Sequence, residues 1–224
     1  MIFKRSNELN ELYLDDFEGK LTQTIVLSHM SWSTYQAMLQ DMGESQPIRT
    51  AYSQGILSLK SPSRVHEKIN RLLAAIVQTL SEELNHKGVN LGSRTIQHAD
   101  IAKAIDPDSG FYLNFSEPEN SDSGQDKILL PDLVIEIDIT SPSTQRMDIY
   151  HDLKIPEVWR YSKSRGLVIY QYESFEYIES ETSSTFPRVT ATRLNDFLIL
   201  RQTQPHNRVI RAVQNWSRKL EQRR

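Results

Sequence analysis

The chain has 224 residues, of which 38% are hydrophobic and 25% charged, and its formal net charge is -3 with a pI of about 6.1. This composition excludes global disorder, and the slight acidity excludes a uniformly basic nucleic-acid coat but not a local basic patch. Cysteine is absent, which excludes disulfides, thiolate metal ligands and a cysteine nucleophile.

No apolar run approaches the roughly 20 residues that a membrane span requires, and the first 20 residues are too polar for a signal peptide. We therefore expect a cytoplasmic protein without membrane contact. Residues 1–20 are predicted to be a variable lead segment, and residues 21–224 a single domain.

The first predicted elements are a helix and a hairpin. The pattern favours a short helix over Trp32–Met42, with Ser31 or Ser33 as its N-cap. Two strands follow, at residues 48–52 and 56–59, and a short glycine-containing loop joins them.

A long amphipathic helix is predicted from about Pro62 to about Glu83, with Ser61 as its N-cap. Its apolar stripe consists of Val65, Ile69, Leu72, Leu73, Ile76, Leu80 and Leu84. Glu67 lies off this stripe, where an exposed first-turn glutamate favoured by the helix dipole is the simplest interpretation. We interpret His66, near the stripe, as a satisfied and partly buried histidine rather than a ligand.

Two strands are predicted after this helix, at Val89–Gln97 and Phe111–Asn114. Between them, Pro107-Asp108 shortly before a glycine is typical of a turn. Residues 115–127 form a polar, turn-rich loop that leads to the next strand.

The most informative stretch is Pro131–Thr140, Pro-Asp-Leu-Val-Ile-Glu-Ile-Asp-Ile-Thr. Successive strand residues point to opposite faces, so one face is apolar and the other carries Asp132, Glu136 and Asp138. The simplest interpretation is a half-buried strand with an acidic solvent face. However, like charges two residues apart repel and acidic residues are poor strand formers. A bound divalent cation would offset both costs, so a metal-binding strand is the alternative.

The C-terminal part is predicted to be a mixture of helices and strands. A short helix covers Gln145–Leu153, and strands follow at residues 156–162, 167–172 and 175–178. The last element, His206–Arg223, is an amphipathic helix with many basic residues. These residues form either a solvated outer face, which we favour, or a contact with nucleic-acid phosphates.

Acidic groups therefore lie at three points: Glu67 on a helix, Asp108 before one strand and Glu136 inside the next. Carboxylate oxygens are ligands that Mg²⁺ prefers, and a metal ion can stabilise charge and activate water during phosphodiester cleavage. If the two strands are antiparallel neighbours, Asp108 and Glu136 could share one cation. A basic residue nearby would then stabilise the charge of the phosphate.

Several motifs occur in a specific order: Ser-Pro-Ser-Arg-Val-His-Glu at 61–67, Pro-Asp at 107–108, Pro-Asp-Leu-Val-Ile-Glu at 131–136, Ser-Pro-Ser at 141–143 and Ile-Pro-Glu-Val-Trp-Arg-Tyr at 155–161. Over roughly residues 25–218 the chain thereby resembles the Uma-type family of predicted restriction endonucleases, within the PD-(D/E)xK nuclease superfamily. The resemblance implies a restriction-endonuclease-like α/β fold, with a mixed β-sheet flanked by helices. Here an N-terminal helix-hairpin and a C-terminal amphipathic helix would accompany it. It also implies metal-dependent DNA hydrolysis, Mg²⁺ or Mn²⁺ as cofactor, DNA as partner and a homodimer.

The resemblance also assigns the acids. By position, Glu67 matches the family's helix glutamate, Asp108 the aspartate of Pro-Asp, and Glu136 the acid of the central strand. It implies that Asp108 and Glu136 bind the metal. Glu67 would bind it through water or orient the site.

One position departs from the usual pattern. The superfamily's lysine normally stands two residues after the strand acid, where this chain has Asp138. In relatives of this type the lysine lies on the following helix, four residues before a tyrosine. In this chain Tyr150 matches the tyrosine, and Arg146 stands at the position of the lysine. Arginine keeps the positive charge and can hold a phosphate oxygen, but it does not readily give up a proton. Lys154 is an alternative cation, about a full turn or more further along.

Two functional hypotheses follow. The leading one is a Mg²⁺-dependent DNA endonuclease in which Arg146 stabilises the scissile phosphate. The alternative is a catalytically impaired nuclease-fold protein that acts as a nucleic-acid-binding or interaction module. Arginine in place of lysine favours the second hypothesis, whereas retention of all three acids favours the first. A purely structural domain with its acids on the surface ranks below both.

Overall fold

The computed structural model describes residues 22–43, 47–86, 89–90, 94–113, 130–139 and 144–221. Three predicted features lie outside these ranges: the lead segment at 1–20, the polar loop at 115–127 and the Ser-Pro-Ser motif at 141–143. The final residues of the last predicted helix also lie outside them.

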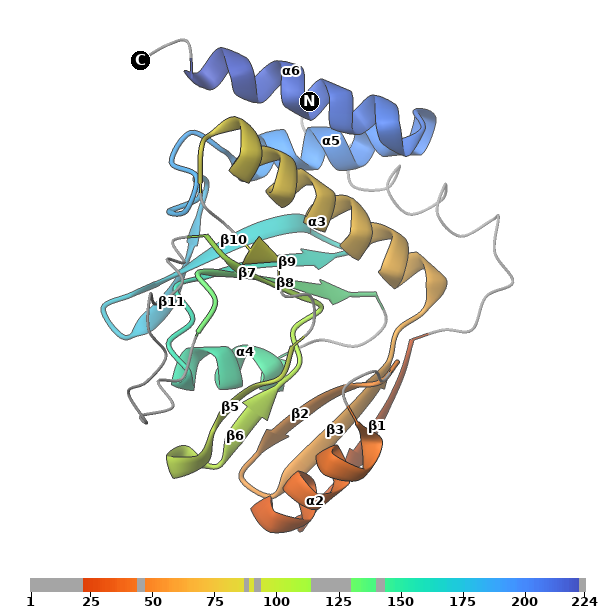
Figure 1. Ribbon diagram of the computed structural model, residues 1–224, viewed down its shortest axis with the longest axis vertical. Helices are drawn as coiled ribbons and strands as arrows, with labels where there is room; N and C mark the ends of the chain where they lie inside the picture. The colour runs from red at the N-terminus through yellow and green to blue at the C-terminus, as the bar shows by residue number, and fades with distance from the viewer. Residues whose placement is uncertain are drawn as a thin grey trace.

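Two β-sheets are joined and covered by helices (Figure 1). The strands are β1 Gln23–Leu27, β2 Arg49–Ser53, β3 Ile56–Ser61, β4 Val89–Asn90, β5 Ile96–His98, β6 Lys103–Ile105, β7 Ser109–Tyr112, β8 Leu133–Asp138, β9 Glu157–Ser162, β10 Gly166–Glu173 and β11 Glu176–Ser180. The helices are α2 Trp32–Met42, α3 Arg64–Glu83, α4 Thr144–Asp152, α5 Ala191–Thr203 and α6 His206–Glu221, with a short 3₁₀ helix at Ala99–Ile101.

The larger sheet has six strands in the order β11-β10-β9-β8-β7-β4, with β8 parallel to β9 and the other pairs antiparallel. The smaller sheet has five antiparallel strands in the order β1-β3-β2-β6-β5. The predicted α/β fold with a mixed sheet flanked by helices is therefore confirmed. The second, antiparallel sheet contains the predicted hairpin together with β5, which overlaps the end of the strand predicted at Val89–Gln97, and with β1 and β6, which were not predicted.

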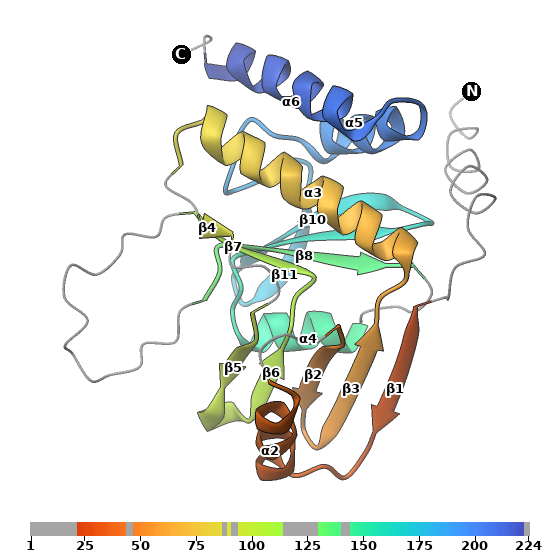
Figure 2. The same cartoon turned by 45° about the vertical axis from the view of Figure 1, so that its right-hand side comes forward.

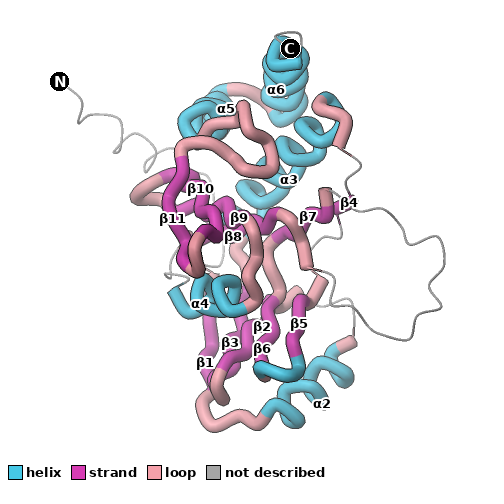
Figure 3. The backbone as a smooth tube through the Cα atoms, turned by 90° about the vertical axis from the view of Figure 1, so that its left-hand side faces the viewer, coloured by secondary structure: helices cyan, strands magenta, loops and turns pink. Residues whose placement is uncertain are grey.

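Strand β8 lies inside the larger sheet, and its two faces differ as predicted. Leu133, Ile135 and Ile137 belong to the core that α3 covers, whereas Val134 belongs to a second apolar cluster built around α4. The expected acidic solvent face is wrong, because every residue of β8 is buried. Helix α4 lies between the two sheets and covers that face (Figure 3).

Helix α3 begins later than predicted. Its N-cap is Ser63, whose Oγ accepts a hydrogen bond from His66 N at 3.2 Å. Ser61 instead ends β3, because it pairs with Gln23 of β1 and this pairing extends the strand. The first turn of α3 therefore directly follows the end of β3 (Figure 2).

Two other local predictions are confirmed, and one is corrected. Ser31, the first of the two candidate N-caps, caps α2 because its Oγ accepts a hydrogen bond from Thr34 N. The hairpin turns through Gln54 and Gly55, both at positive φ, which suits a two-residue hairpin loop. The single strand predicted at Val89–Gln97 is wrong, because β4 pairs with β7 and β5 pairs with β6 in the other sheet.

The basic C-terminal helix α6 packs on α3 and α5 (Figure 1). Val209 and Val213 are buried, and Arg218 donates to both oxygens of Glu83 on α3, at 2.7 and 2.9 Å. These contacts favour the interpretation of α6 as a packed helix with a solvated outer face. In the described part of the chain, no helix combines the length and apolar character that a bilayer crossing requires.

Candidate active site

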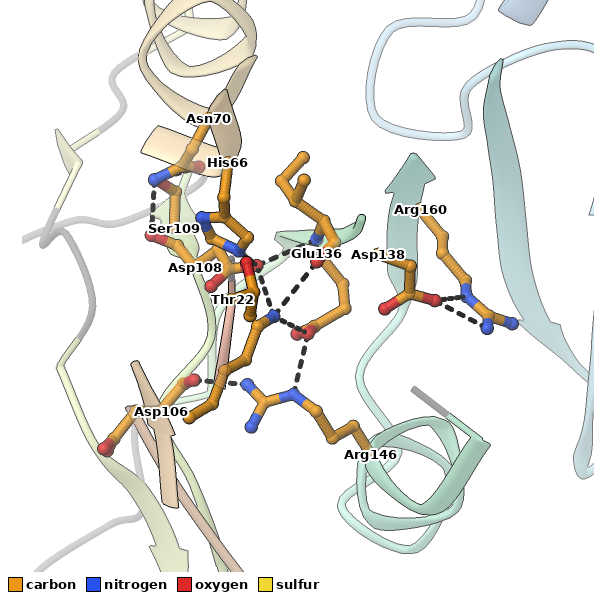
Figure 4. Close-up of polar contacts among 12 residues, drawn as sticks. Thr22, His66, Asn70, Asp106, Asp108, Ser109, Glu136, Asp138, Arg146 and Arg160 are labelled. Atoms are coloured by element: carbon orange, nitrogen blue, oxygen red, sulfur yellow. Dashed lines mark hydrogen bonds and ion pairs between the residues drawn. The ribbon is translucent and has the colours of Figure 1, made fainter. Parts of the chain in front are cut away.

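Four segments meet between the two sheets: the end of β3, the first turn of α3, the residues before β7 and the middle of β8. They bring together Lys60, His66, Asp108 and Glu136, and α4 contributes Arg146. Figure 4 labels all of these residues except Lys60. The pairing of β7 with β8 is antiparallel, as the sequence argument required, and it sets Asp108 beside β8.

Asp108 is held mainly through one oxygen. Its Oδ2 accepts from Ile137 N at 2.8 Å and lies 2.9 Å from His66 Nε2 and 3.2 Å from Lys60 Nζ. Asn70 Nδ2 donates to its main-chain carbonyl at 2.9 Å. Burial would raise the pKa of Asp108, but Lys60 and His66 outweigh it and hold that pKa well below its usual range. Asp108 is therefore an ionised carboxylate at neutral pH.

Glu136 uses both of its carboxylate oxygens. Oε1 lies 2.9 Å from Lys60 Nζ and accepts from Arg146 Nε at 2.7 Å, while Oε2 accepts from Tyr150 Oη at 2.9 Å. Arg146 also donates through Nη2 to the carbonyl of Asp106 at 2.5 Å. The guanidinium is thus fixed at two points, and Glu136 faces two cations.

Three oxygen atoms converge on the ammonium of Lys60, and we call them the oxygen cage. They are Asp108 Oδ2 at 3.2 Å, Glu136 Oε1 at 2.9 Å and the carbonyl oxygen of Ile137 at 3.0 Å. Burial would lower the pKa of Lys60, but Asp108 and Glu136 raise it, and the net shift is upward. The group inside the oxygen cage is therefore a charged ammonium.

Glu67 is brought near the oxygen cage but not into it. Its Oε1 lies 3.8 Å from His66 Nδ1, and its Oε2 lies 4.0 Å from Arg71 Nε. Because His66 Nε2 contacts Asp108, the ring of His66 links Glu67 to the oxygen cage. Within the described residues, no group of three His, Asp or Glu side chains is arranged to hold a metal ion. The structure thus brings two of the three predicted acids together.

Asp138, at the position of the superfamily's usual lysine, pairs with the neighbouring strand. Both Nε and Nη2 of Arg160 lie 2.7 Å from Asp138 Oδ2 (Figure 4). An ammonium at this position would face the Arg160 guanidinium, which gives a physical reason for a carboxylate here. Lys154, the alternative cation, is exposed in the turn after α4.

Sequence reasoning missed Lys60 and underestimated His66. The alternation of β3 places Ser58 and Lys60 on the face opposite Leu57, but a lysine near a strand end is normally exposed. Its position just before the motif at 61–67 is the only hint in the sequence. His66 is fully buried rather than partly buried, and its Nε2 pairs with Asp108 Oδ2.

Four buried polar atoms of this cluster have no hydrogen-bond partner among the residues that the structure describes. They are His66 Nδ1, Asp106 Oδ1, Asp108 Oδ1 and Arg146 Nη1. Buried polar atoms are normally hydrogen-bonded, so such atoms mark contact points for a ligand or for water. The cluster can therefore offer carboxylate oxygens to a cation and an N–H donor to an anion.

Comparison with known proteins places the chain in a family. No curated protein matches it. Among solved structures, it is similar to the 1.96 Å crystal structure of "a putative nuclease belonging to DUF820 from Anabaena variabilis ATCC 29413". The TM-score is 0.51 at 14% identity, over 75% of this chain and 98% of that chain, which shows a shared fold. The Uma2 family, described as "Putative restriction endonuclease", matches residues 32–205. Since this match covers more than half of the sequence, the chain belongs to the Uma2 family.

Proposed function

We propose that this protein is a metal-dependent endonuclease that hydrolyses DNA phosphodiester bonds at the oxygen cage. The observation that carries the proposal is the convergence of Asp108 Oδ2, Glu136 Oε1 and the Ile137 carbonyl on one positively charged atom, at 2.9–3.2 Å. Membership of the Uma2 family supports a nucleic acid as the substrate.

The oxygen cage fits Mg²⁺ or Mn²⁺ in the type of its donor atoms. Carboxylate and carbonyl oxygens are the ligands that these ions prefer, and Asp108 Oδ1 is one further buried oxygen. We assign direct metal binding to Asp108 and Glu136, and a positioning role to Glu67 through His66. When bound, the divalent cation would neutralise phosphate charge and activate a water molecule.

Arg146 is proposed to hold the scissile phosphate. Glu136 and the Asp106 carbonyl fix its guanidinium through Nε and Nη2, whereas Nη1 has no partner among the described residues. Burial would lower the pKa of Arg146, but Glu136 raises it and the net shift is upward. A charged donor that is already oriented stabilises developing phosphate charge with little reorganisation.

A second function, that of a catalytically impaired nucleic-acid-binding or interaction module, is favoured by one observation. Lys60 and Arg146 already balance the charges of Asp108 and Glu136 without any metal ion. A protein of this kind would bind DNA in a salt-dependent way without cutting it.

Cleavage of supercoiled plasmid DNA separates the two functions. Wild type, Glu136→Gln and Glu179→Gln are compared in Mg²⁺, in Mn²⁺ and in chelator. Glu179 forms an exposed pair with Arg165, so Glu179→Gln is purified in the same way but keeps the site. The proposal predicts metal-dependent cutting by wild type and Glu179→Gln, and none by Glu136→Gln. Equal cutting by all three would identify a contaminant, and an inert wild type that still binds DNA would support the second function.

The single domain over residues 21–224 and the homodimer stay predictions. Light scattering of the purified protein would give twice the chain mass of 26.0 kDa for a homodimer. The chain mass itself would contradict the homodimer.

A further inference from the structure

Lys60 is a buried lysine that is surrounded by oxygen atoms. Its side chain is 9% exposed, whereas the side chains of Asp108 and Glu136 are 0% exposed. Lysine is almost never buried unless it is paired, and here three oxygens from two other segments provide the pairing. The ammonium occupies the position that the same oxygens would offer to any cation.

The backbone of Lys60 is fixed, but its side chain can leave. The strand pairs with β1 through Thr24 and with β2 through Arg49, both opposite Lys60. The oxygens of the cage belong to β8 and to the segment before β7, and none of them belongs to β3, the strand that carries Lys60. A flexible four-carbon side chain joins the Lys60 ammonium to β3. Withdrawal of the ammonium would therefore involve rotation of the side chain rather than displacement of β3.

We propose that the Lys60 ammonium is the resident cation of the oxygen cage, and that a divalent cation binds by displacing it. An ammonium and a metal ion cannot both contact Asp108 Oδ2, Glu136 Oε1 and the Ile137 carbonyl at the same point. Metal binding is then an exchange of one cation for another, with no bond made or broken in the chain. The inference rests on the proposed function for the choice of metal, but not on cleavage.

Charge balance indicates what favours the exchange. Asp108 and Glu136 carry two negative charges against one each on Lys60 and Arg146, so these four groups together are formally neutral. A divalent ion in the oxygen cage leaves Lys60 as an additional positive charge at its edge. A phosphodiester anion compensates this charge, so DNA should strengthen metal binding.

Removal of the ammonium should remove the competition. Lys60→Met keeps a long unbranched side chain but has no charge. Lys103→Met is a matched control, because Lys103 has a similarly buried side chain, 11% exposed, that pairs with Asp152 away from the oxygen cage. The two variants therefore lose the same group at two different places.

Calorimetric titration of the full chain with Mn²⁺ tests the competition. We expect the dissociation constant for Mn²⁺ to be at least about tenfold lower in Lys60→Met than in wild type, because a like charge has left the site. Lys103→Met should bind as wild type does. Equal or weaker binding by Lys60→Met would overturn the proposal, as would the absence of Mn²⁺ binding in both proteins.

Labelling of wild type with an amine-reactive reagent tests displacement directly, and it does not depend on the folding of a variant. Mass spectrometry then follows each lysine with and without Mn²⁺ at the concentration that saturates the calorimetric signal. Lys60 should react slowly without Mn²⁺ and at least about tenfold faster with it, because a released ammonium becomes accessible, while Lys103 should not change. Unchanged labelling of Lys60 would overturn the exchange. Exchange without plasmid cleavage would uphold it and would overturn the proposed function instead.

Discussion

Lys60 Nζ and Glu136 Oε1 lie 2.9 Å apart, although the two residues are 76 positions apart in the chain and belong to different sheets. This contact joins β3 to β8 and places a positive charge between the two acids before any ligand binds. A buried ion pair of this kind is costly to break from one side, because the remaining charge stays buried without compensation.

The first prediction concerns this ion pair. In chelator, Lys60→Met should lower the free energy of unfolding by about 3–5 kcal/mol, because Asp108 and Glu136 then keep fewer buried partners. Lys103→Met should lose less stability, because Asp152, the partner of Lys103, is 35% exposed and water screens the pair. Denaturant unfolding measures both values. A loss of stability in Lys60→Met no larger than that in Lys103→Met would contradict this prediction.

The second prediction concerns Arg146. If the protein cuts DNA, Arg146→Ala should slow single-turnover cleavage by about a hundredfold or more, as expected for the loss of one preorganised donor. Arg146→Lys should be intermediate, because one ammonium cannot span Glu136 and the Asp106 carbonyl as the guanidinium does. Cleavage by Arg146→Ala at the wild-type rate would exclude Arg146 from the reaction.

The third prediction concerns pH and His66. Burial would lower the pKa of His66, but hydrogen bonding with Asp108 outweighs it and raises that pKa above its ordinary value of 6.5. Since the folded-state pKa is the higher one, the stabilisation is fully present below pH 6.5 and is lost as the pH rises through the folded-state pKa. In chelator, wild type should therefore lose stability above about pH 6.5, and His66→Gln should lose less over the same range.

Denaturant unfolding at several pH values measures how steeply the free energy of unfolding falls as the pH rises. An equal fall in wild type and His66→Gln would contradict the role given to His66. Asp108 acts in a separate window, because its folded-state pKa is lowered. Its contribution is present above its ordinary value of 3.8 and is lost as the pH falls through the lower folded-state value.

The fourth prediction concerns the start of α3. Ser63→Ala should lower the free energy of unfolding by about 1 kcal/mol, because it removes the acceptor for His66 N. Ser61→Ala is the matched control and should have little effect, because Ser61 is an exposed strand residue. In denaturant unfolding, a larger loss of stability in Ser61→Ala than in Ser63→Ala would identify Ser61 as the N-cap instead.

The elements that local periodicity determines could be predicted from the sequence. The stripe of α3 and the alternation of β8 both depend on residues within one element. The strand predicted at 89–97 failed because β4 and β5 pair with different sheets, and pairing overrides local propensity. Ser61 was misassigned for the same reason, since its partner strand β1 was not predicted.

The candidate site shows the same division. Asp108 and Glu136 could be found because they stand in recognisable motifs, and Arg146 because it stands four residues before Tyr150. Lys60 could not, because its role depends on how two sheets pack, and its partners lie 48 and 76 positions away. No local pattern encodes a contact of that separation.

The position of Mn²⁺ in crystals of the wild-type protein, located by anomalous scattering, is the most direct test of the oxygen cage. We predict one peak in contact with Asp108 Oδ2, Glu136 Oε1 and the carbonyl oxygen of Ile137, with the ammonium of Lys60 withdrawn from all three. A Mn²⁺ peak elsewhere, with Lys60 Nζ still between the two carboxylates, would contradict both the metal site and the exchange.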